Sequence, residues 1–297
     1  MGNDPLISIL MTAYNRQKYI AEAIESVLAS TYSNFELIIV DDFSNDNTLE
    51  IARSYEAKDK RIRVYVNEKN LGDYPNRNQA ANYANGKYIQ YIDSDDLLHY
   101  WGLQVEVDMM ERFPNAAYGM AMRDEVESVF PILLSPKEAY ENYYLKKLGG
   151  IFNGAPTSVI IRKEKFDFVN GFSNERQVGD YDLWHKLALH NSVLLLPGGF
   201  IWTRTHEGQE FKEFYINPMI SFQYTMVSYR YLNHLDCPLL ASECEKLKEI
   251  RLIYLAKQII KHLIKGNFQL TTEMMNLAEL SFQNVLRLMV KFFFSKL

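Results

Sequence analysis

The sequence contains little cysteine and no long apolar run. Cys237 and Cys244 are its only cysteines in 297 residues, so a disulfide framework is excluded and a reducing compartment is favoured. No stretch reaches the roughly 18 apolar residues that a membrane-spanning helix requires. The opening residues MGNDPLISIL lack the basic start and the long apolar core of a signal peptide. We therefore expect a cytoplasmic protein.

An excess of basic charge and several nucleotide-related motifs are also missing. Lysine and arginine number 32 against 37 aspartates and glutamates, a net charge of −5, so we expect no nucleic-acid partner. The sequence has no Gly-x-Gly-x-x-Gly after its first apolar run, no Gly-x-x-x-x-Gly-Lys-Ser/Thr and no Gly-x-Ser-x-Gly. These absences argue against a dinucleotide cofactor, a phosphate-loop ATPase and an esterase.

What the chain does contain is 47% hydrophobic residues, which is typical of a globular protein. In its first hundred residues, short apolar runs alternate with helical patterns, and this alternation predicts a parallel sheet with right-handed crossovers. The predicted strands are 6–11, 35–40, 61–66 and 88–92, and the helical patterns between them are 20–28, 45–57 and 75–86.

The rest of the chain is less regular up to about residue 216 and helical beyond it. Helices are predicted at 103–113 and 181–190, strands at 158–162 and 192–204, and a later helix ends at Gly266. We predict an α/β fold with a mostly parallel central sheet flanked by helices. Residues 1–216 would form the catalytic domain, with a nucleotide-binding half (1–100) and an acceptor-side half (101–216), and 217–297 a helical C-terminal extension.

Polar clusters follow three of the predicted strands. They are Thr12 to Asn15, Asp41-Asp42, and Asp93-Ser94-Asp95-Asp96. Ligands of parallel sheets bind beyond the carboxyl ends of the strands, so these clusters predict one site. The acidic cluster has two interpretations: Ser94 or Asp95 caps a helix starting near Leu97, or the carboxylates bind Mg²⁺ or Mn²⁺ together with substrate phosphates.

In combination, these motifs resemble those of the inverting family 2 glycosyltransferases with a GT-A fold. ISILMTAYNRQKYIAEAIESVL is similar to the opening strand, loop and helix of that family. FELIIVDDFSNDNT is similar to its second-strand signature, with Phe43 in place of the usual glycine. NLGDYPNRNQAANYANGKYIQYIDSDD resembles the segment that leads through an Arg-Asn pair to a metal-binding Asp-x-Asp. The resemblance implies a Rossmann-like GT-A fold, a nucleotide diphosphate sugar donor, and Mn²⁺ or Mg²⁺ as cofactor.

The resemblance also implies roles for individual residues. Asp42 would accept a hydrogen bond from the base imide, which favours a uracil or thymine nucleotide over a purine. The alternatives in which these residues bind no ligand are surface packing for Tyr14, a helix cap for Asp42, a solvated helix face for Arg77 and a structural role for His206. The residues implied to bind nucleotide are Thr12, Ala13, Tyr14, Asp41, Asp42, Arg77, Asp93 and Ser94, and those implied to bind metal are Asp95, Asp96 and His206.

An inverting transfer needs a general base that deprotonates the acceptor hydroxyl. The stretch QVGDYDLWHKLALH resembles the family's Glu-Asp pair at the start of a helix, which makes Asp180 the expected catalytic base. Gly179 stands where Glu is usual, so the second carboxylate is missing. The alternative for Asp180 is an N-terminal cap of the helix at 181–190.

The C-terminal stretch 286–297 is apolar and basic, so it can lie on an anionic membrane surface, dock on the catalytic domain or join a homodimer partner. We predict a metal-dependent inverting glycosyltransferase of bacterial surface polysaccharide synthesis. It would move a sugar from a nucleotide diphosphate donor, a UDP-sugar, to a hydroxyl of a glycan or lipid-linked acceptor. It would be cytoplasmic, with peripheral contact at the inner face of the cell membrane. The alternatives are an inactive nucleotide-sugar or glycan-binding module, which Gly179 keeps open, and a sugar nucleotidyltransferase.

Overall fold

The structure is a computed structural model that describes residues 4–122, 130–145, 151–206 and 217–294. The chain divides into two compact units, Met1–Glu207 and Gly208–Leu297, and each has its own hydrophobic core. The predicted domain boundary after residue 216 adjoins residues 207–216, which lie outside the described ranges, so it stays a prediction.

The first unit is built on one large sheet. Its strands are β1 (Ile7–Ala13), β2 (Phe35–Asp41), β3 (Ile62–Val66), β4 (Tyr88–Asp93), β6 (Ala116–Ala121), β7 (Ile132–Leu134), β8 (Val159–Arg162) and β9 (Ser192–Leu196). Their order in space is β3-β2-β1-β4-β8-β6-β9-β7. Strands β7 and β8 run antiparallel to their neighbours, while the other pairings are parallel. This mostly parallel sheet confirms the predicted fold class.

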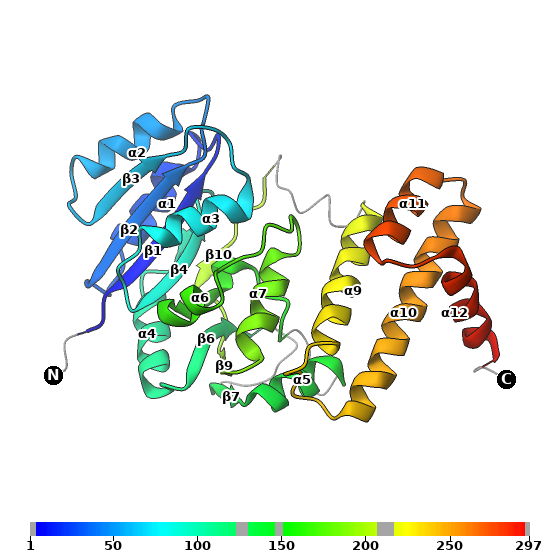
Figure 1. The fold of residues 1–297 in the computed structure, drawn as a ribbon. Helices are drawn as coiled ribbons and strands as arrows, with labels where there is room; N and C mark the ends of the chain where they lie inside the picture. Colours follow the sequence, from blue (N-terminus) through cyan, green and yellow to red (C-terminus); the bar gives the residue numbers. More distant parts are fainter. Residues whose placement is uncertain (1–3, 123–129, 146–150, 207–216, 295–297) are drawn as a thin grey trace. The chain divides into compact units, whose positions relative to one another are not determined.

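Helices flank the sheet, as Figure 1 shows. They are α1 (Ile20–Leu28), α2 (Thr48–Glu56), α3 (Asp73–Asn82), α4 (Gly102–Arg112), α5 (Pro136–Tyr144), α6 (Lys163–Phe168) and α7 (Gly179–Ala188), with a 3-10 turn at Pro156–Ser158.

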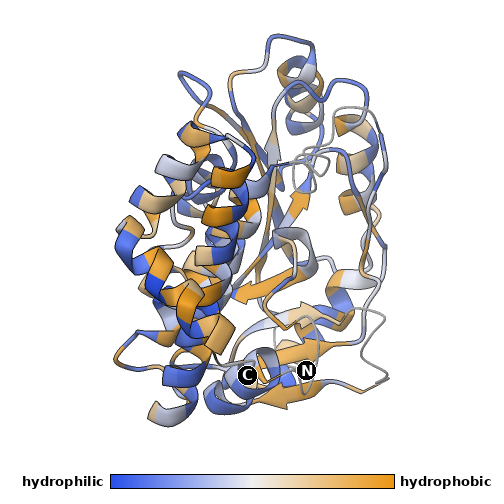
Figure 2. Ribbon diagram, turned by 90° about the vertical axis from the view of Figure 1, so that its right-hand side faces the viewer, coloured by the Kyte–Doolittle hydropathy of each residue, from blue (hydrophilic) through white to orange (hydrophobic). Residues whose placement is uncertain are grey.

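Strand β1 shows why the sheet forms where the sequence predicts it. Its alternate residues Ile7, Ile9 and Met11 share one core cluster with Ile20 and Ile24 of α1, because side chains two apart on a strand point to the same face. The other face of β1 is also buried, as expected for a strand covered on both sides. Figure 2 shows strands of the sheet in the orange of apolar residues.

The stretch 192–204, predicted as one strand, forms two strands in different sheets, so that prediction was wrong. After β9 the chain turns at Gly198 and Gly199, and Gly199 has a φ of 95°, which a residue with a side chain rarely adopts. The chain then forms β10 (Ile201–Trp202), which pairs antiparallel with β5 (Leu97–Leu98). This short ribbon follows the acidic cluster directly and connects it to the segment that carries Arg204 and His206.

Glu106 of α4 is a charged residue in the core. Its side chain is fully buried, and neither carboxyl oxygen has a hydrogen-bond partner among the described residues. Burial raises the pKa of Glu106 to about 8, since a low-dielectric environment disfavours the charged form. The folded protein therefore holds this carboxyl as the neutral acid at pH 7.

We expect Glu106→Leu to flatten the dependence of stability on pH. The pKa of Glu106 is higher in the folded than in the unfolded chain. Its contribution to the free energy of unfolding is therefore fully present below its pKa in the unfolded chain, and is lost as pH rises towards 8. Relative to wild type, the variant should gain about 3 kcal/mol in unfolding free energy between pH 5 and pH 8. Urea denaturation at both pH values measures this difference, and an equal ΔΔG at both would contradict it.

The second unit is helical. The long helix α10 has α9, α11 and α12 around it, and Phe222, Leu255, Ile259 and Val285 are buried in its core. Among the described residues, no helix is both long enough and apolar enough to cross a membrane. The helices are α9 (Pro218–Leu232), α10 (Ala241–Ile264), α11 (Phe268–Leu277) and α12 (Phe282–Phe294).

Helix α12 contains most of the apolar, basic stretch 286–297. One face docks on α10, where Val285 is buried and Lys257 lies over the Phe292 ring, 3.4 Å from its centroid. A second apolar face stays exposed and includes Leu286 and Val290. Docking within the unit thus accounts for one face only, and contact with a membrane or a second copy stays a prediction.

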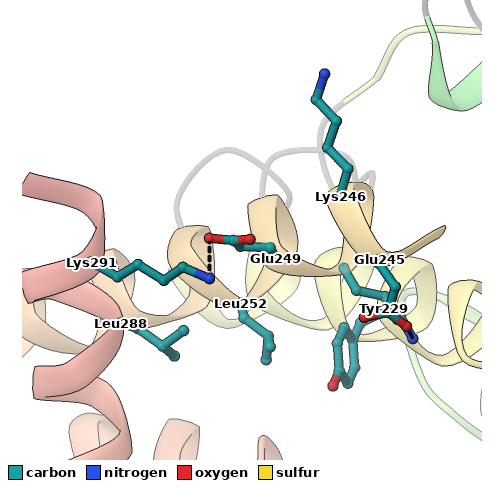
Figure 3. A pocket seen from close by; sticks show the side chains of 8 residues that line it. Tyr229, Glu245, Lys246, Glu249, Leu252, Leu288 and Lys291 are labelled. Carbon is teal, nitrogen blue, oxygen red and sulfur yellow. Dashed lines mark ion pairs between the residues drawn. The ribbon is translucent and has the colours of Figure 1, made fainter. Parts of the chain in front are cut away.

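A groove of the second unit lies between α9, α10 and α12 and is shown in Figure 3. Four of its charged side chains form two ion pairs, Lys291 with Glu249 at 2.7 Å and Lys248 with Glu245 at 2.5 Å. Within each pair the two charges offset each other. Its lining residues are Tyr229, Glu245, Lys246, Lys248, Glu249, Leu252, Leu288 and Lys291.

Candidate active site

The carboxyl ends of β1, β2 and β4 meet at one edge of the sheet. Thr12 lies opposite Val40 on one side and Asp93 on the other, and Ala13 lies opposite Asp41. The register of the sheet thus brings the three predicted polar clusters together. Thr12 is half-buried and Ala13 is buried, so the strand ends form the floor of the site.

The acidic cluster follows β4. Asp93, Asp95 and Asp96 each offer a carboxylate oxygen, and these oxygens lie within 4.8 Å of one another. Ser94 between them is buried. Burial, together with the charges of Asp93 and Asp95, raises the pKa of Asp96 to about 7. The cluster therefore concentrates negative charge in a poorly solvated place, which is what a bound cation would offset.

The helix-cap interpretation of the acidic cluster is wrong. The residues that follow it, Leu97 and Leu98, form β5 rather than a helix. The next helix, α4, begins at Gly102, and Trp101 is its N-cap. Neither Ser94 nor Asp95 is therefore placed to cap a helix.

Asp95 is held by two cationic or polar side chains. Its Oδ2 accepts from Arg16 Nε at 2.8 Å and lies 2.9 Å from His206 Nε2. Arg204 donates its backbone N–H to Asp96 Oδ1 at 3.0 Å. His206 therefore lies against the cluster through Asp95, and its role as a metal ligand stays a prediction. The three-carboxylate group contains Asp93, which we had expected to bind nucleotide.

A cation would find a suitable set of donors here. Carboxylate oxygens in a group of three are ligands that hard divalent cations prefer, and such ions also keep substrate phosphates in their coordination sphere. Asp93 and Asp96 have side-chain oxygens beside Asp95 in this arrangement. The residues present thus fit a divalent metal ion.

Arg77 of α3 joins this cluster to the helix behind it. Its guanidinium bonds Asp93 Oδ1 through Nη2 and Asp73 Oδ1 through Nε, both at 2.7 Å. The side chain is buried, so the solvated-face alternative is wrong. Its third nitrogen, Nη1, is buried and has no hydrogen-bond partner among the described residues.

Asp42 holds a neighbouring loop. Its Oδ1 accepts from Asn67 Nδ2 at 2.7 Å and Leu71 N at 2.8 Å, and its Oδ2 accepts from Gly72 N at 2.9 Å. A carboxylate has about four lone-pair sites, so these three hydrogen bonds leave one site of Oδ2 unused. The helix-cap alternative is wrong, because α2 has Asn47 at its N-cap.

Asp41 and the loops beside it complete the nucleotide side. Asp41 is buried, with Oδ1 accepting from Ser44 N at 2.9 Å. Tyr14 is 41% exposed, so its ring is accessible for stacking. Phe43 has a φ of 67°, a left-handed conformation that costs a non-glycine residue about 1–2 kcal/mol. This explains why the resemblance leads one to expect glycine there.

Asp180 lies in the first turn of α7. The N-cap of this helix is Val178, so the cap interpretation of Asp180 is wrong. Its Oδ1 accepts from Tyr181 N at 2.7 Å. Burial raises the pKa of Asp180 to about 6, against the Tyr181 N–H and the Tyr74 side chain of α3, which lower it. The carboxyl can therefore accept a proton near neutral pH.

One helix connects the two chemical groups. Tyr74 and Arg77 are three residues apart on α3, so they share a face. Tyr74 packs against Gly179, the neighbour of Asp180, and Arg77 bonds Asp93. One turn of α3 therefore contacts both the acidic cluster and the segment that carries the candidate base.

Sequence reasoning missed two residues of this arrangement. Arg16 pairs with Asp95, yet lies far from it in the sequence, and only its position after the first strand hinted at the site. Tyr74 could have been found from its helical spacing to Arg77.

Comparisons with known proteins agree with this geometry. The sequence profile described as Glycosyl transferase family 2 matches residues 8–169. An Escherichia coli protein named UDP-Glc:alpha-D-GlcNAc-diphosphoundecaprenol beta-1,3-glucosyltransferase WfgD is 31% identical over 204 residues, which are 68% of this chain and 77% of that protein.

Two solved structures share the fold. Staphylococcus aureus TarS 1–349 in complex with UDP-GlcNAc has a TM-score of 0.65 and 21% identity, covering 83% of this chain and 71% of that fragment. The mannosyltransferase PcManGT of Pyrobaculum calidifontis, in complex with GDP-Man and Mn²⁺, has a TM-score of 0.61 and 14% identity, covering 96% of this chain and 88% of its own. At these identities the likeness concerns the fold alone.

Proposed function

The chain belongs to glycosyl transferase family 2, and from this premise we propose that it is an inverting, metal-dependent transferase that moves a sugar from a UDP-linked donor to a hydroxyl of a glycan or lipid-linked acceptor. The observation that carries the proposal is the arrangement around α3, where Arg77 bonds the acidic cluster at Asp93 and Tyr74 packs against Gly179, the neighbour of Asp180. That arrangement supports placing a diphosphate site and a base next to one transferred sugar.

In this proposal, Asp180 accepts the proton of the acceptor hydroxyl as the oxygen attacks the anomeric carbon. The positive charge of Arg77, which lies against the acidic cluster at Asp93, would act on the diphosphate. Asp93, Asp95 and Asp96 would hold Mn²⁺ or Mg²⁺, which when bound offsets the charge that develops on the departing diphosphate. The acceptor oxygen attacks the anomeric carbon directly and the diphosphate leaves from the opposite face, so the transfer is a single displacement with inversion.

The nucleobase of the donor and the acceptor are proposed on separate grounds. TarS binds UDP-GlcNAc and PcManGT binds GDP-Man, so the shared fold does not decide between uracil and guanine. The lone pair that remains on Asp42 suits the N–H of a uracil imide. The acceptor class follows the name of WfgD, whose acceptor is a diphosphoundecaprenol-linked sugar. This supports a role in bacterial surface polysaccharide synthesis at the inner face of the membrane.

We expect UDP to raise the thermal stability of the protein only when Mn²⁺ is present. A ligand at 100 times its dissociation constant adds about 2.7 kcal/mol, and GDP at the same concentration should add much less. Thermal unfolding with each nucleotide, with Mn²⁺ or with EDTA, measures this. A response to GDP alone would overturn the role given to Asp42, and a UDP response without any sugar transfer would favour the inactive binding module.

A further inference from the structure

Gly179 is not required by its own backbone conformation. It does not have a positive φ, and it lies at the first position of α7, where most residues fit. What excludes a side chain is Tyr74: a Cβ on Gly179 would lie 2.6 Å from Tyr74 Cδ2 and 2.7 Å from Cε2. These are closer than real contacts allow. The Tyr74 ring therefore occupies the space that a side chain at position 179 would need.

The Tyr74 ring has little freedom to move away. Its side chain is buried and stacks on Phe172, with ring centroids 5.1 Å apart. Tyr74 lies in the first turn of α3, and its neighbour Asp73 accepts a hydrogen bond from Arg77. The close approach between Tyr74 and Gly179 is thus fixed from the Tyr74 side.

The same ring carries a hydroxyl to the candidate base. This hydroxyl lowers the pKa of the Asp180 carboxyl, and the backbone of Asp180 acts on the Tyr74 hydroxyl in return. The other groups that act on the Asp180 carboxyl are the Tyr181 N–H, the Asp73 carboxylate and the Arg77 guanidinium. Tyr74 and Arg77 are the two side chains among these groups that lower the pKa of the carboxyl.

We propose that Tyr74 is the positioning residue of Asp180, and that Gly179 is the small partner that lets the Tyr74 ring reach it. The loss of the usual second carboxylate is then compensated: a tyrosine on α3 takes over the space and holds the base. This inference rests on the proposed function, since it gives Asp180 the role of base. It adds a residue and a mechanism of support that the family resemblance does not contain.

The hydroxyl is tested by Tyr74→Phe, which keeps the ring. Because the hydroxyl lowers the pKa of Asp180, its loss disfavours the ionised carboxylate. The acidic limb of the kcat/KM profile, expected near pH 6 in wild type, should therefore move up by about one pH unit. The control is Tyr140→Phe, which removes a buried hydroxyl bonded to the His185 carbonyl. It should leave the limb in place. An unmoved limb in Tyr74→Phe would overturn the positioning role.

The packing is tested without any activity measurement. Gly179→Ala should lower the Tm of the wild-type protein by about 5 °C, since overpacking a well-filled site costs about 1–3 kcal/mol. In a Tyr74→Ala background the same change should alter the Tm by less than about 2 °C. Equal losses in both backgrounds would overturn the claim that the ring excludes a side chain.

A glutamate at position 179, tested alone and together with Tyr74→Ala, connects packing to catalysis. Gly179→Glu alone should displace the ring and lower kcat at least tenfold, while adding Tyr74→Ala should recover part of this loss, because space for the new side chain is then available. A double variant that is no faster than Gly179→Glu alone would contradict the claim that the two side chains compete for the same space.

Failure of this inference is distinguishable from failure of the proposed function. If Asp180→Asn leaves transfer unchanged, the base is wrong whatever Tyr74 does. If Asp180→Asn abolishes transfer while Tyr74→Phe has the wild-type profile, the function holds and only the positioning role fails.

Discussion

Asp180→Asn is expected to lower kcat for sugar transfer by about a thousandfold while leaving donor binding within about twofold of wild type. General-base catalysis by a positioned side chain contributes roughly 10²–10⁴ to a rate, and the amide cannot accept the hydroxyl proton. Steady-state transfer assays, with UDP binding measured by calorimetry, separate the two effects. In wild type, kcat/KM should fall about tenfold per pH unit below the pKa of Asp180, which is about 6, since only the ionised carboxylate acts as base.

Unfolding does not explain such a loss. The pKa of Asp180 is higher in the folded chain than its ordinary value of 3.8, so its contribution to stability is present below that value and lost as pH rises through about 6. At pH 7.5 the ionised carboxyl therefore does not stabilise the fold, and the asparagine variant should have an undiminished Tm. Asp182→Asn is the control: it is in the same helical turn and pairs with Lys186 at 3.3 Å. It should keep its kcat, and a similar fall in both variants would refute the assignment.

Asp95→Asn is expected to remove the metal-dependent part of donor binding. A cation at the cluster contributes several kcal/mol of charge stabilisation, so kcat in Mn²⁺ should fall by about a hundredfold or more. UDP affinity in Mn²⁺ should fall to the value that wild type shows in EDTA, and the variant should be insensitive to EDTA. Calorimetric titration of UDP with and without Mn²⁺ measures this.

The control for the metal experiment is Asp108→Asn. Asp108 is an exposed aspartate of α4 that accepts from Gln104 at 3.0 Å and lies outside the acidic cluster. Its substitution should change neither the Mn²⁺ response nor the rate. If UDP binds wild type and Asp95→Asn with equal affinity in Mn²⁺, the cluster is not the metal site, and the pairs of Asp95 with Arg16 and His206 would then be structural.

The sequence predicts the nucleotide half of the fold better than the other half, for a physical reason. Strands β1, β2 and β4 are apolar on both faces, so each reads as a run of hydrophobic residues. Strand β6, with the sequence AAYGMA, carries almost no such signal, because alanine and glycine have low strand propensity. It becomes a strand through pairing with β8 and β9, which is tertiary information.

The same distinction applies to the site. Residues in consecutive motifs, such as Asp93 to Asp96, are visible in the sequence because they adjoin a strand end. Arg16 pairs with Asp95 across the fold, and no local pattern in the sequence indicates such a contact. Gly179 was visible as a departure from the expected glutamate, but its cause was not, since the ring that excludes a side chain belongs to another helix.

The contact between Tyr74 and Gly179 also constrains how this lineage can change. While the tyrosine holds its position, a side chain at 179 meets a buried ring, so we expect each larger residue there to cost stability. A variant that carries the acidic pair should therefore be better tolerated when position 74 holds a smaller residue. We expect the two positions to be coupled, so that the order of substitutions affects which of the two arrangements a lineage can reach.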